Sequence, residues 1–398
     1  GSGPRSYADG TGTSAHFNYP MGVTNVGDYL YINDRYNHRI RKVHKSTGVV
    51  TTFAGSTSGY QDATGTAAKF YYPWGIKNDG TNLYVGDGHN HRIRKIAVST
   101  GAVTTLAGST SGTADGSGTA AQFSYPYEVG IDENNVYVAD YSNNRIRKIA
   151  LRGTVTADVK LHNLDDDTDA VVSIASSDTG EGTVSPATLT FTEANWNTAQ
   201  TVTVAGVNDT DRDRHQAYKI SLSAGDQDLE SAEVTTFAGS GNSGSVNATG
   251  TSASFNKPHG ITTDGTNLYV AERDNHVIRK IVISTGAVTT IAGSAGSYGS
   301  TNGTGTSARF YYPRAITTDG TNLYVADTSN HKIRKIVIST GAVTTLAGST
   351  SGYQDGTGTS AKFSGIYGLS TDGTNVYVAD YSNHRIRKIV ISTGVVTT

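Results

Sequence analysis

The sequence predicts an all-β protein: a six-bladed β-propeller with a β-sandwich inserted in blade three. Three observations lead to this fold class. A unit of similar sequence occurs six times, the unit has no helical period, and one interruption within a unit has an alternating pattern of its own. Repeats of about 50 residues are typical of propellers and solenoids. The repeat therefore has to be interpreted before any local motif.

The repeat is easiest to follow through the acidic residue that ends a YVAD-type tetrad. That residue is found at Asp34, Asp87, Asp140, Glu272, Asp327 and Asp380. Consecutive positions differ by 53, 53, 132, 55 and 53 residues, so the third interval exceeds the 53-residue repeat by 79. In every unit a phenylalanine precedes the tetrad and a V-T-T element follows it. The six copies share one plan, and the third copy is interrupted.

Each unit contains four short runs that favour β-strands. In the second unit these runs are PWGIK, NLYVGD, HRIRKIAV and AVTTLAG, and the turns between them are NDGT, GHN and STG. A four-stranded sheet of this size cannot bury a core alone, so six sheets must pack around an axis. The chain ends with a V-T-T strand, and it starts with the segment that follows the V-T-T strand in the other units. We therefore expect blade six to be complete within its own unit and the ring to close without exchanging a strand.

The repeated unit resembles the NHL-repeat family. The resemblance rests on the elements P-x-G-I, YVAD and NHRIRKI, and it extends over the six units. It implies a six-bladed propeller. Some NHL propellers bind nucleic acid, which would imply a polyanionic partner, but the net charge of −2 disfavours that partner here.

The interruption predicts a second domain. The predicted domains are residues 1–150 (blades one to three, first part), 151–233 (the insert) and 234–398 (the end of blade three and blades four to six). Within the insert, the alternating runs LTFT, QTVTVAG and YKISLSA predict an antiparallel sandwich. The stretch GTVSPATLTFTEANWNTAQTVTVAGVND resembles the Calx-beta-like modules of bacterial surface proteins. This resemblance implies an adhesive, stalk or spacer role, and calcium binding in some relatives.

Charge is divided unevenly between the two parts. The insert holds 5 basic and 15 acidic residues, which leaves 27 basic and 19 acidic residues for the propeller. Two turns of the insert carry aspartates at alternate positions, at Asp165, Asp167, Asp169, Asp209, Asp211 and Asp213. Carboxylate oxygens at alternate positions suit calcium. A solvated acidic loop is the alternative, because no complete ligand loop of known spacing is visible. No other cofactor is predicted.

Residues that recur in every blade are interpreted as structural. The Asn37-His38 pair recurs in four other units, and Asn144 replaces the histidine in the third, so we expect these side chains to make turn or inter-blade hydrogen bonds. The Arg41-Lys42 pair of the I-R-K element also recurs around the ring. We interpret these basic residues as serving solubility and protection of strand edges.

Candidate site residues are found where the units disagree. The residue after the proline position, at the mouth of each innermost strand, differs in almost every blade: Met21, Trp74, Tyr127, His259, Arg314 and Tyr367. The loop after the YVAD acid should lie on the same face, and its candidates are Arg35, Tyr141, Arg273 and Tyr381. Aromatic and arginine side chains at the entrance of a funnel suit stacking on sugar rings or gripping a loop of another protein. Drift at solvent-exposed positions is the alternative.

Composition narrows the function class. The chain has no cysteine and one methionine, which excludes disulfides and thiolate metal sites, and it has no apolar run long enough to span a membrane. We expect an extracellular or cell-surface binding or adhesive scaffold whose partner is a protein or carbohydrate on a cell surface or matrix. Self-association as the subunit of a bacterial surface assembly or filament is the second interpretation.

An enzyme is the third interpretation. A metal-dependent propeller lyase or hydrolase would need several ligands converging on the channel, and His259 is the only histidine at the mouth position. No nucleophile elbow, phosphate loop or paired-carboxylate motif stands out. We therefore expect no catalytic activity.

Overall fold

A computed structural model describes residues 5–132, 134–151, 155–159, 170–173, 182–191, 200–206 and 232–398. The chain divides into two compact units. The larger comprises residues 1–149 and 234–398, and the smaller comprises residues 150–233. No helix in the described part of the chain is long and apolar enough to span a lipid bilayer.

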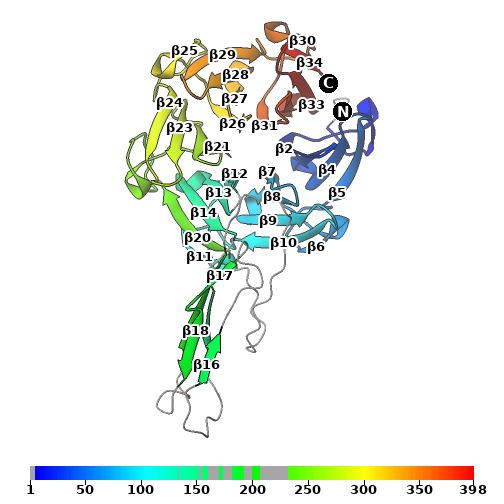
Figure 1. Cartoon of the computed structure of the whole chain (residues 1–398). Coiled ribbons are helices and arrows are strands. Elements are labelled where there is room, and N and C mark those ends of the chain that lie inside the picture. Colours follow the sequence, from blue (N-terminus) through cyan, green and yellow to red (C-terminus); the bar gives the residue numbers. More distant parts are fainter. Residues whose placement is uncertain are drawn as a thin grey trace. The chain divides into compact units, whose positions relative to one another are not determined.

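The larger unit is a six-bladed β-propeller, as predicted (Figure 1). Each blade is an antiparallel sheet whose four main strands come from one sequence unit and run in order from the axis outward. In the first three blades these strands are β2 (Pro20–Val26), β3 (Tyr29–Asp34), β4 (Arg39–His44) and β5 (Val49–Ala54); β7 (Pro73–Asn78), β8 (Asn82–Asp87), β9 (Arg92–Ala97) and β10 (Ala102–Ala107); and β12 (Pro126–Ile131), β13 (Asn135–Asp140), β14 (Arg145–Ala150) and β20 (Glu233–Ala238).

The last three blades follow the same order. Their strands are β21 (Pro258–Thr263), β22 (Asn267–Glu272), β23 (Val277–Val282) and β24 (Val288–Gly293); β26 (Pro313–Thr318), β27 (Asn322–Asp327), β28 (Lys332–Val337) and β29 (Ala342–Ala347); and β31 (Ile366–Thr371), β32 (Asn375–Asp380), β33 (Arg385–Val390) and β34 (Val395–Thr397). Blade six therefore exchanges no strand with blade one. The ring closes where β2 packs beside β31, and this seam between blades one and six can be followed in Figure 1.

Most blades have a fifth, two-residue strand at the outer edge, which the sequence did not predict. These strands are β1 (Gly10–Thr11), β6 (Ala63–Thr64), β11 (Gly116–Ser117), β25 (Gly303–Thr304) and β30 (Gly356–Thr357). The helices of the described residues are single 3₁₀ turns: Gly12–Ser14, Arg35–Asn37, Gly65–Ala67, Gly88–Asn90, Gly118–Ala120, Tyr141–Asn143, Gly250–Ser252, Gly305–Ser307, Thr328–Asn330, Gly358–Ser360 and Tyr381–Asn383.

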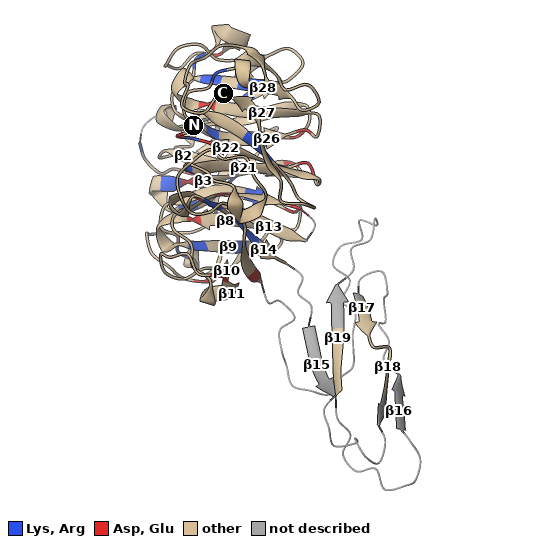
Figure 2. Ribbon diagram, turned by 90° about the vertical axis from the view of Figure 1, so that its left-hand side faces the viewer, with Lys and Arg blue, Asp and Glu red and all other residues tan. Residues whose placement is uncertain are grey.

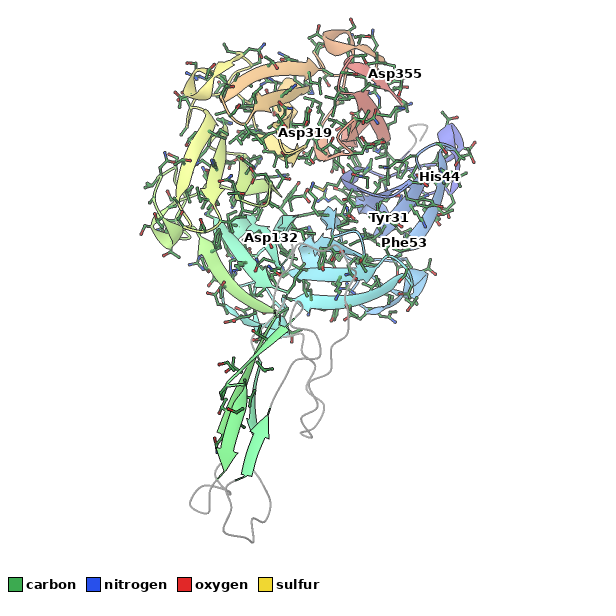
Figure 3. The ribbon with its side chains drawn as sticks, viewed as in Figure 1. Tyr31, His44, Phe53, Asp132, Asp319 and Asp355 are labelled. Atoms are coloured by element: carbon green, nitrogen blue, oxygen red, sulfur yellow. The ribbon has the colours of Figure 1, made fainter. Side chains whose placement is uncertain are left out.

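The turn between the first two strands of a blade shows how local chemistry fixes a hairpin. In blade five, Asp319 Oδ1 accepts a hydrogen bond from the Asn322 backbone N–H at 2.6 Å, and its Oδ2 accepts one from the Tyr324 hydroxyl at 2.8 Å (Figure 3). Gly320 takes the positive φ of 87° that the turn requires. Because the Tyr324 side chain is fully buried, its hydrogen bond to Asp319 connects the turn to the core. The apolar core lies between neighbouring blades, where side chains such as Phe255 have no exposed surface.

The arginine of the I-R-K element is buried in every blade, which corrects the interpretation that it serves solubility and edge protection. Arg41 donates to Asp34 Oδ2 at 2.8 Å and to Asp9 Oδ1 at 2.6 Å, and also to two backbone carbonyls. The six arginines have no exposed surface: Arg41, Arg94, Arg147, Arg279, Arg334 and Arg387. A planar guanidinium with several fixed acceptors satisfies buried acidic groups well. In Figure 2 basic and acidic segments are accordingly distributed through the blades instead of forming one charged face.

The repeated Asn-His pair makes the predicted turn and inter-blade hydrogen bonds. Asn37 donates to Asp34 Oδ2 at 2.8 Å, and His38 Nδ1 accepts the backbone N–H of Tyr72 in the next blade at 3.2 Å. In blade three, Asn144 Oδ1 accepts the Lys257 N–H at 2.9 Å in the same way. His331 of blade five is an exception, since its buried Nδ1 has no partner among the described residues.

The smaller unit contains two small antiparallel sheets among its described residues. One is formed by β15 (Val155–Val159), β19 (Gln200–Gly206) and β17 (Gly182–Ser185), and the other by β16 (Ala170–Ser173) and β18 (Thr188–Phe191). The predicted run QTVTVAG coincides with β19, and the run LTFT overlaps β18. The run YKISLSA and the six aspartates of the calcium interpretation lie outside the described residues, so the sandwich and the calcium site stay predictions.

Candidate functional site

The backbone at the start of each innermost strand directs one side chain toward the axis. In blade two the β-ladder between β7 and β8 pairs Pro73 with Asp87 and then resumes only at Ile76, so the two residues between them lie in a bulge. Proline has no N–H to contribute to the ladder, and a bulge changes the direction of a side chain. A register shift at the same place recurs in the other five blades, with two unpaired residues in blades one, three and five and one in blades four and six.

The six residues after the proline position come together at the axis, and we call them the mouth cluster. Met21, Trp74 and Tyr127 form one apolar cluster, and the Tyr127 hydroxyl lies 3.9 Å from Met21 Sδ. The His259 ring lies 3.4 Å from that of Tyr127, centroid to centroid. The remaining two members contact each other, because the Arg314 guanidinium lies over the Tyr367 ring at 4.2 Å.

The mouth cluster is more buried than the sequence predicted. Met21, Trp74, Tyr127 and His259 are 2%, 7%, 8% and 1% exposed, whereas Arg314 and Tyr367 are partly exposed. The expected ring around an open funnel is thus a group of side chains that fill the axis by packing on one another. Figure 3 shows side chains extending into the centre of the ring. Of the six residues, only Arg314 and Tyr367 keep a substantial exposed surface.

The four loop candidates form two matching pairs, which the sequence did not predict. Arg35 donates to the hydroxyl of Tyr381 at 2.8 Å, and Arg273 donates to the hydroxyl of Tyr141 at 2.9 Å. Each pair joins the arginine of one blade to the tyrosine of the blade before it. All four side chains are partly exposed. The two pairs therefore hold cationic groups at the edge of the mouth cluster.

Positive charge gathers around the axis. Arg35, Arg273 and Arg314 come from blades one, four and five, and Lys257 Nζ lies 4.9 Å from the Tyr141 ring. Asp274 pairs with Arg273 at 3.2 Å. A surface of this charge attracts anionic groups.

His259 presents a lone pair at the centre of the cluster. Its Nδ1 lies 3.1 Å from the Arg314 carbonyl oxygen, which can only accept, so we assign the proton to Nδ1 and the lone pair to Nε2. Burial, with Arg314 and Arg273 nearby, holds the pKa of His259 well below its usual range. In the described part of the chain neither His259 Nε2 nor the buried Trp74 Nε1 has a hydrogen-bond partner. These two atoms are an acceptor and a donor without partners in the described chain, and the Nε atoms of Arg35, Arg273 and Arg314 also have none.

Sequence reasoning missed an aromatic surface around the cluster. The Tyr367 ring stacks on Tyr381 at 4.3 Å, and the contacts continue through Tyr19, Tyr36 and Tyr72 at 4.6–5.0 Å between centroids. A signal was present, because a tyrosine precedes the proline in four of the six units. These tyrosines have positive φ near 50°, which is unusual for a bulky residue and directs their rings across the face.

Sequence reasoning also missed two buried ionisable residues of the innermost strands, Glu128 and Lys77. Glu128 replaces the glycine of the P-x-G element, and burial raises its pKa to about 7. Lys77, from the neighbouring blade, donates to the Leu369 carbonyl of blade six at 3.2 Å, and burial lowers its pKa. Both residues are departures from the repeat, which is the signal that could have identified them. Among the residues that the structure describes, no group of three or more His, Cys, Asp or Glu side chains could hold a metal ion.

Comparison with known proteins supports the repeat assignment. No protein-family model matches the chain. It is 29% identical over 352 residues to NHL repeat-containing protein 2 of Gallus gallus and 28% identical over 400 residues to that of Homo sapiens. These matches cover 81% and 94% of this chain but 46% of each relative, so the chain spans about half the length of the relatives it matches.

Solved structures share the fold at low identity. A Bacteroides thetaiotaomicron protein of unknown function matches with a TM-score of 0.60 at 18% identity, and an auxiliary nutrient binding protein of the same organism matches with a TM-score of 0.56 at 14% identity. Each match covers 96% of this chain and 72% of the other chain. The chain is thus similar to NHL repeat-containing proteins, and its larger unit is a six-bladed β-propeller.

Proposed function

We propose that this protein is an extracellular binding scaffold whose ligand, a carbohydrate, docks on the face formed by the mouth cluster and its two Arg–Tyr pairs. The observation that carries the proposal is the combination of stacked, partly exposed aromatic rings with fixed hydrogen-bonding groups. Tyr367 and Tyr381 offer flat apolar surface, and Arg314 and Arg35 offer donors beside it. Sugar rings present apolar faces and a polar circumference, which this arrangement complements.

The unpartnered groups at the axis are indirect support for the same ligand class. A sugar hydroxyl both donates and accepts, so it suits the His259 Nε2 lone pair and the Trp74 indole N–H, but both atoms are buried and a ligand reaches them only if the mouth cluster shifts. The arginine Nε atoms are weaker evidence, because the six structural arginines also leave Nε without a partner among the described residues. Two neighbours of similar fold are named nutrient binding proteins, which is in keeping with a binding role.

The inserted domain is proposed to act as an adhesive or spacer module of the Calx-beta-like type. Calcium at its two acidic turns is part of this proposal. A rise in its unfolding temperature on adding calcium, reversed by a chelator, is the expected result. No response to calcium would favour the solvated-loop alternative. We propose no catalytic role for the propeller.

A glycan array followed by calorimetric titration of the hits tests the carbohydrate proposal. Tyr367→Ala and Arg314→Gln should each weaken binding about tenfold or more, because each removes a stacking or donor group at the site. The control is Lys388→Ala, an exposed residue of the third strand of blade six. Equal affinities for all three variants and the wild type would contradict the proposed site, and binding of proteins but of no glycan would contradict the ligand class.

A further inference from the structure

The loop before blade five differs from its counterparts at one structural position. Tyr298 forms an isolated parallel bridge with Phe310, and the equivalent bridges of four other blades use serine: Ser58, Ser111, Ser243 and Ser351. The spacing of 55 residues between Glu272 and Asp327, instead of 53, arises here. The two additional residues form a short turn closed by a bridge between Ser294 and Ser297. The chain thus departs from its repeat in length and in residue type at the same point.

The departure produces a stack of three tyrosines, which we call the tyrosine file. The Tyr298 ring stacks on Tyr311 at 4.7 Å and 25° between planes, and Tyr311 stacks on Tyr312 at 4.8 Å and 27°. The Arg273 guanidinium lies over Tyr312 at 4.9 Å and bonds the Tyr141 hydroxyl. The file therefore leads from the outer loop of blade five to the edge of the mouth cluster.

Tyr298 is held in place although it faces solvent. It is 65% exposed, the highest value among the exposed large hydrophobic residues of the described chain. Stacking on Tyr311 and an edge contact with His276 at 5.8 Å fix its ring. Blade two provides an internal comparison, because the Tyr71 and Tyr72 rings contact each other there at 4.9 Å and the third position is Ser58. The third ring is thus an addition that the propeller itself does not need.

We propose that the tyrosine file extends the carbohydrate site and that the ligand is a linear, acidic oligosaccharide lying from the mouth cluster to Tyr298. This inference rests on the proposed function. An ordered, exposed aromatic ring costs little entropy on binding and suits one further sugar residue. Cations lie at the mouth end of the file: Arg273 contacts Tyr312, Arg314 contacts Tyr367, and Lys257 contacts Tyr141. Together they outnumber Asp274, which pairs with Arg273, and they favour carboxylate groups on the chain. Affinity should consequently depend on the length and the charge of the oligosaccharide.

A chain-length series separates the file from the mouth. Galacturonic acid oligomers of one to six residues are titrated calorimetrically against the wild type and Tyr298→Ser, which restores the serine of the other units. Wild-type affinity should increase with length, and Tyr298→Ser should remove a gain of about five- to tenfold for the longest chains while leaving the shortest unchanged. Tyr353→Ser is the matched control, since Tyr353 is 46% exposed and lies outside the file. It should bind every oligomer as the wild type does.

The outcomes distinguish this inference from the proposed function. If Tyr298→Ser binds long and short acidic oligomers as the wild type does, the extended site is wrong and the carbohydrate site at the mouth stands. If neutral glucose oligomers of equal length bind as tightly, the acidic ligand class is wrong. Binding of a peptide or a nucleic acid with no oligosaccharide bound would overturn both proposals. Unchanged thermal unfolding of Tyr298→Ser, expected for so exposed a residue, assigns any loss of affinity to the ligand contact.

Discussion

The buried arginine sites within the blades and the mouth cluster on the axis are each formed by one repeat position that occurs in all six blades. The residue at the first position is the same in every blade, whereas the residue at the second position varies. Arg41 and its five counterparts are identical and equally buried. The six residues after the proline position are nearly all different. Each buried arginine bonds partners from its own unit, such as Asp34 and Asp9, so the site can be copied without conflict.

Residues of the mouth cluster contact the residues at the same repeat position in other blades, so one large side chain cannot occupy that position in all six blades. Met21 and Tyr127 come from blades one and three, and they still touch. Six identical large side chains directed at one axis would overlap, because protein interiors have no spare volume. Packing is therefore a third explanation for why the mouth residues differ between blades, besides the ligand binding and the drift inferred from the sequence. Gly88 illustrates it: a Cβ there would lie 2.7 Å from the Trp74 ring, at a position where other blades carry Arg35 or Tyr141.

The largest expected effect comes from breaking one uniform site. Arg387→Met should destabilise the propeller by about 3–5 kcal/mol, because it leaves the buried Asp380 without its cation. Lys388→Met, the next residue on the same strand, is exposed and should change the free energy of unfolding by less than about 0.5 kcal/mol. Chemical denaturation of both variants measures the difference. Equal stabilities would mean that the buried pair is dispensable.

The packing explanation of the mouth is tested by a double-mutant cycle. Trp74→Ala should cost about 3 kcal/mol because it leaves a cavity on the axis. Gly88→Ala alone should also destabilise, since its Cβ meets the indole ring. In the Trp74→Ala background the added methyl group should be tolerated, so the two losses should not add. Additive losses in thermal unfolding would argue against packing as the cause of divergence here.

Glu128 predicts a pH effect of intermediate size. Because its folded-state pKa of about 7 lies above the ordinary value of 4.5, its contribution to stability is complete below about pH 4.5 and is lost as the pH rises through 7. Glu128→Gln should therefore be more stable than the wild type at pH 8, by up to about 2 kcal/mol, with the gap closing at pH 5. Lys77→Met should steepen the wild-type trend, because it removes the nearby cation. A gap independent of pH would contradict this assignment.

The smallest effect concerns the seams between blades. His276→Ala should cost about 1 kcal/mol, because it removes the acceptor of the Tyr312 N–H at 3.2 Å. His331→Ala should cost less, since His331 Nδ1 has no partner among the described residues. His276→Asn should restore stability, as Asn144 does naturally in blade three. Urea denaturation compares the three variants, and equal losses for both alanine variants would contradict the seam bond.

The sequence by itself determined the number of blades, the four main strands of each blade and the position of the interruption. These features follow from signals confined to one unit, such as the Asp319 turn and the alternation along β7–β10, so they can be read without knowing what lies beside them. The Asn-His pair was also predictable, because a residue that recurs in every unit has a structural role in every unit.

Only the tertiary structure decided which repeated and which variable side chains are buried. The sequence placed the I-R-K arginines at the surface, whereas acceptors from two distant loops of the unit enclose them. It also predicted an open mouth, whereas residues as far apart as Met21 and Tyr127, separated by 106 positions, meet and fill it. The arginine–tyrosine pairs and the tyrosine file arise in the same way. Such contacts depend on how blades converge around the axis, and no local pattern in the sequence encodes that convergence.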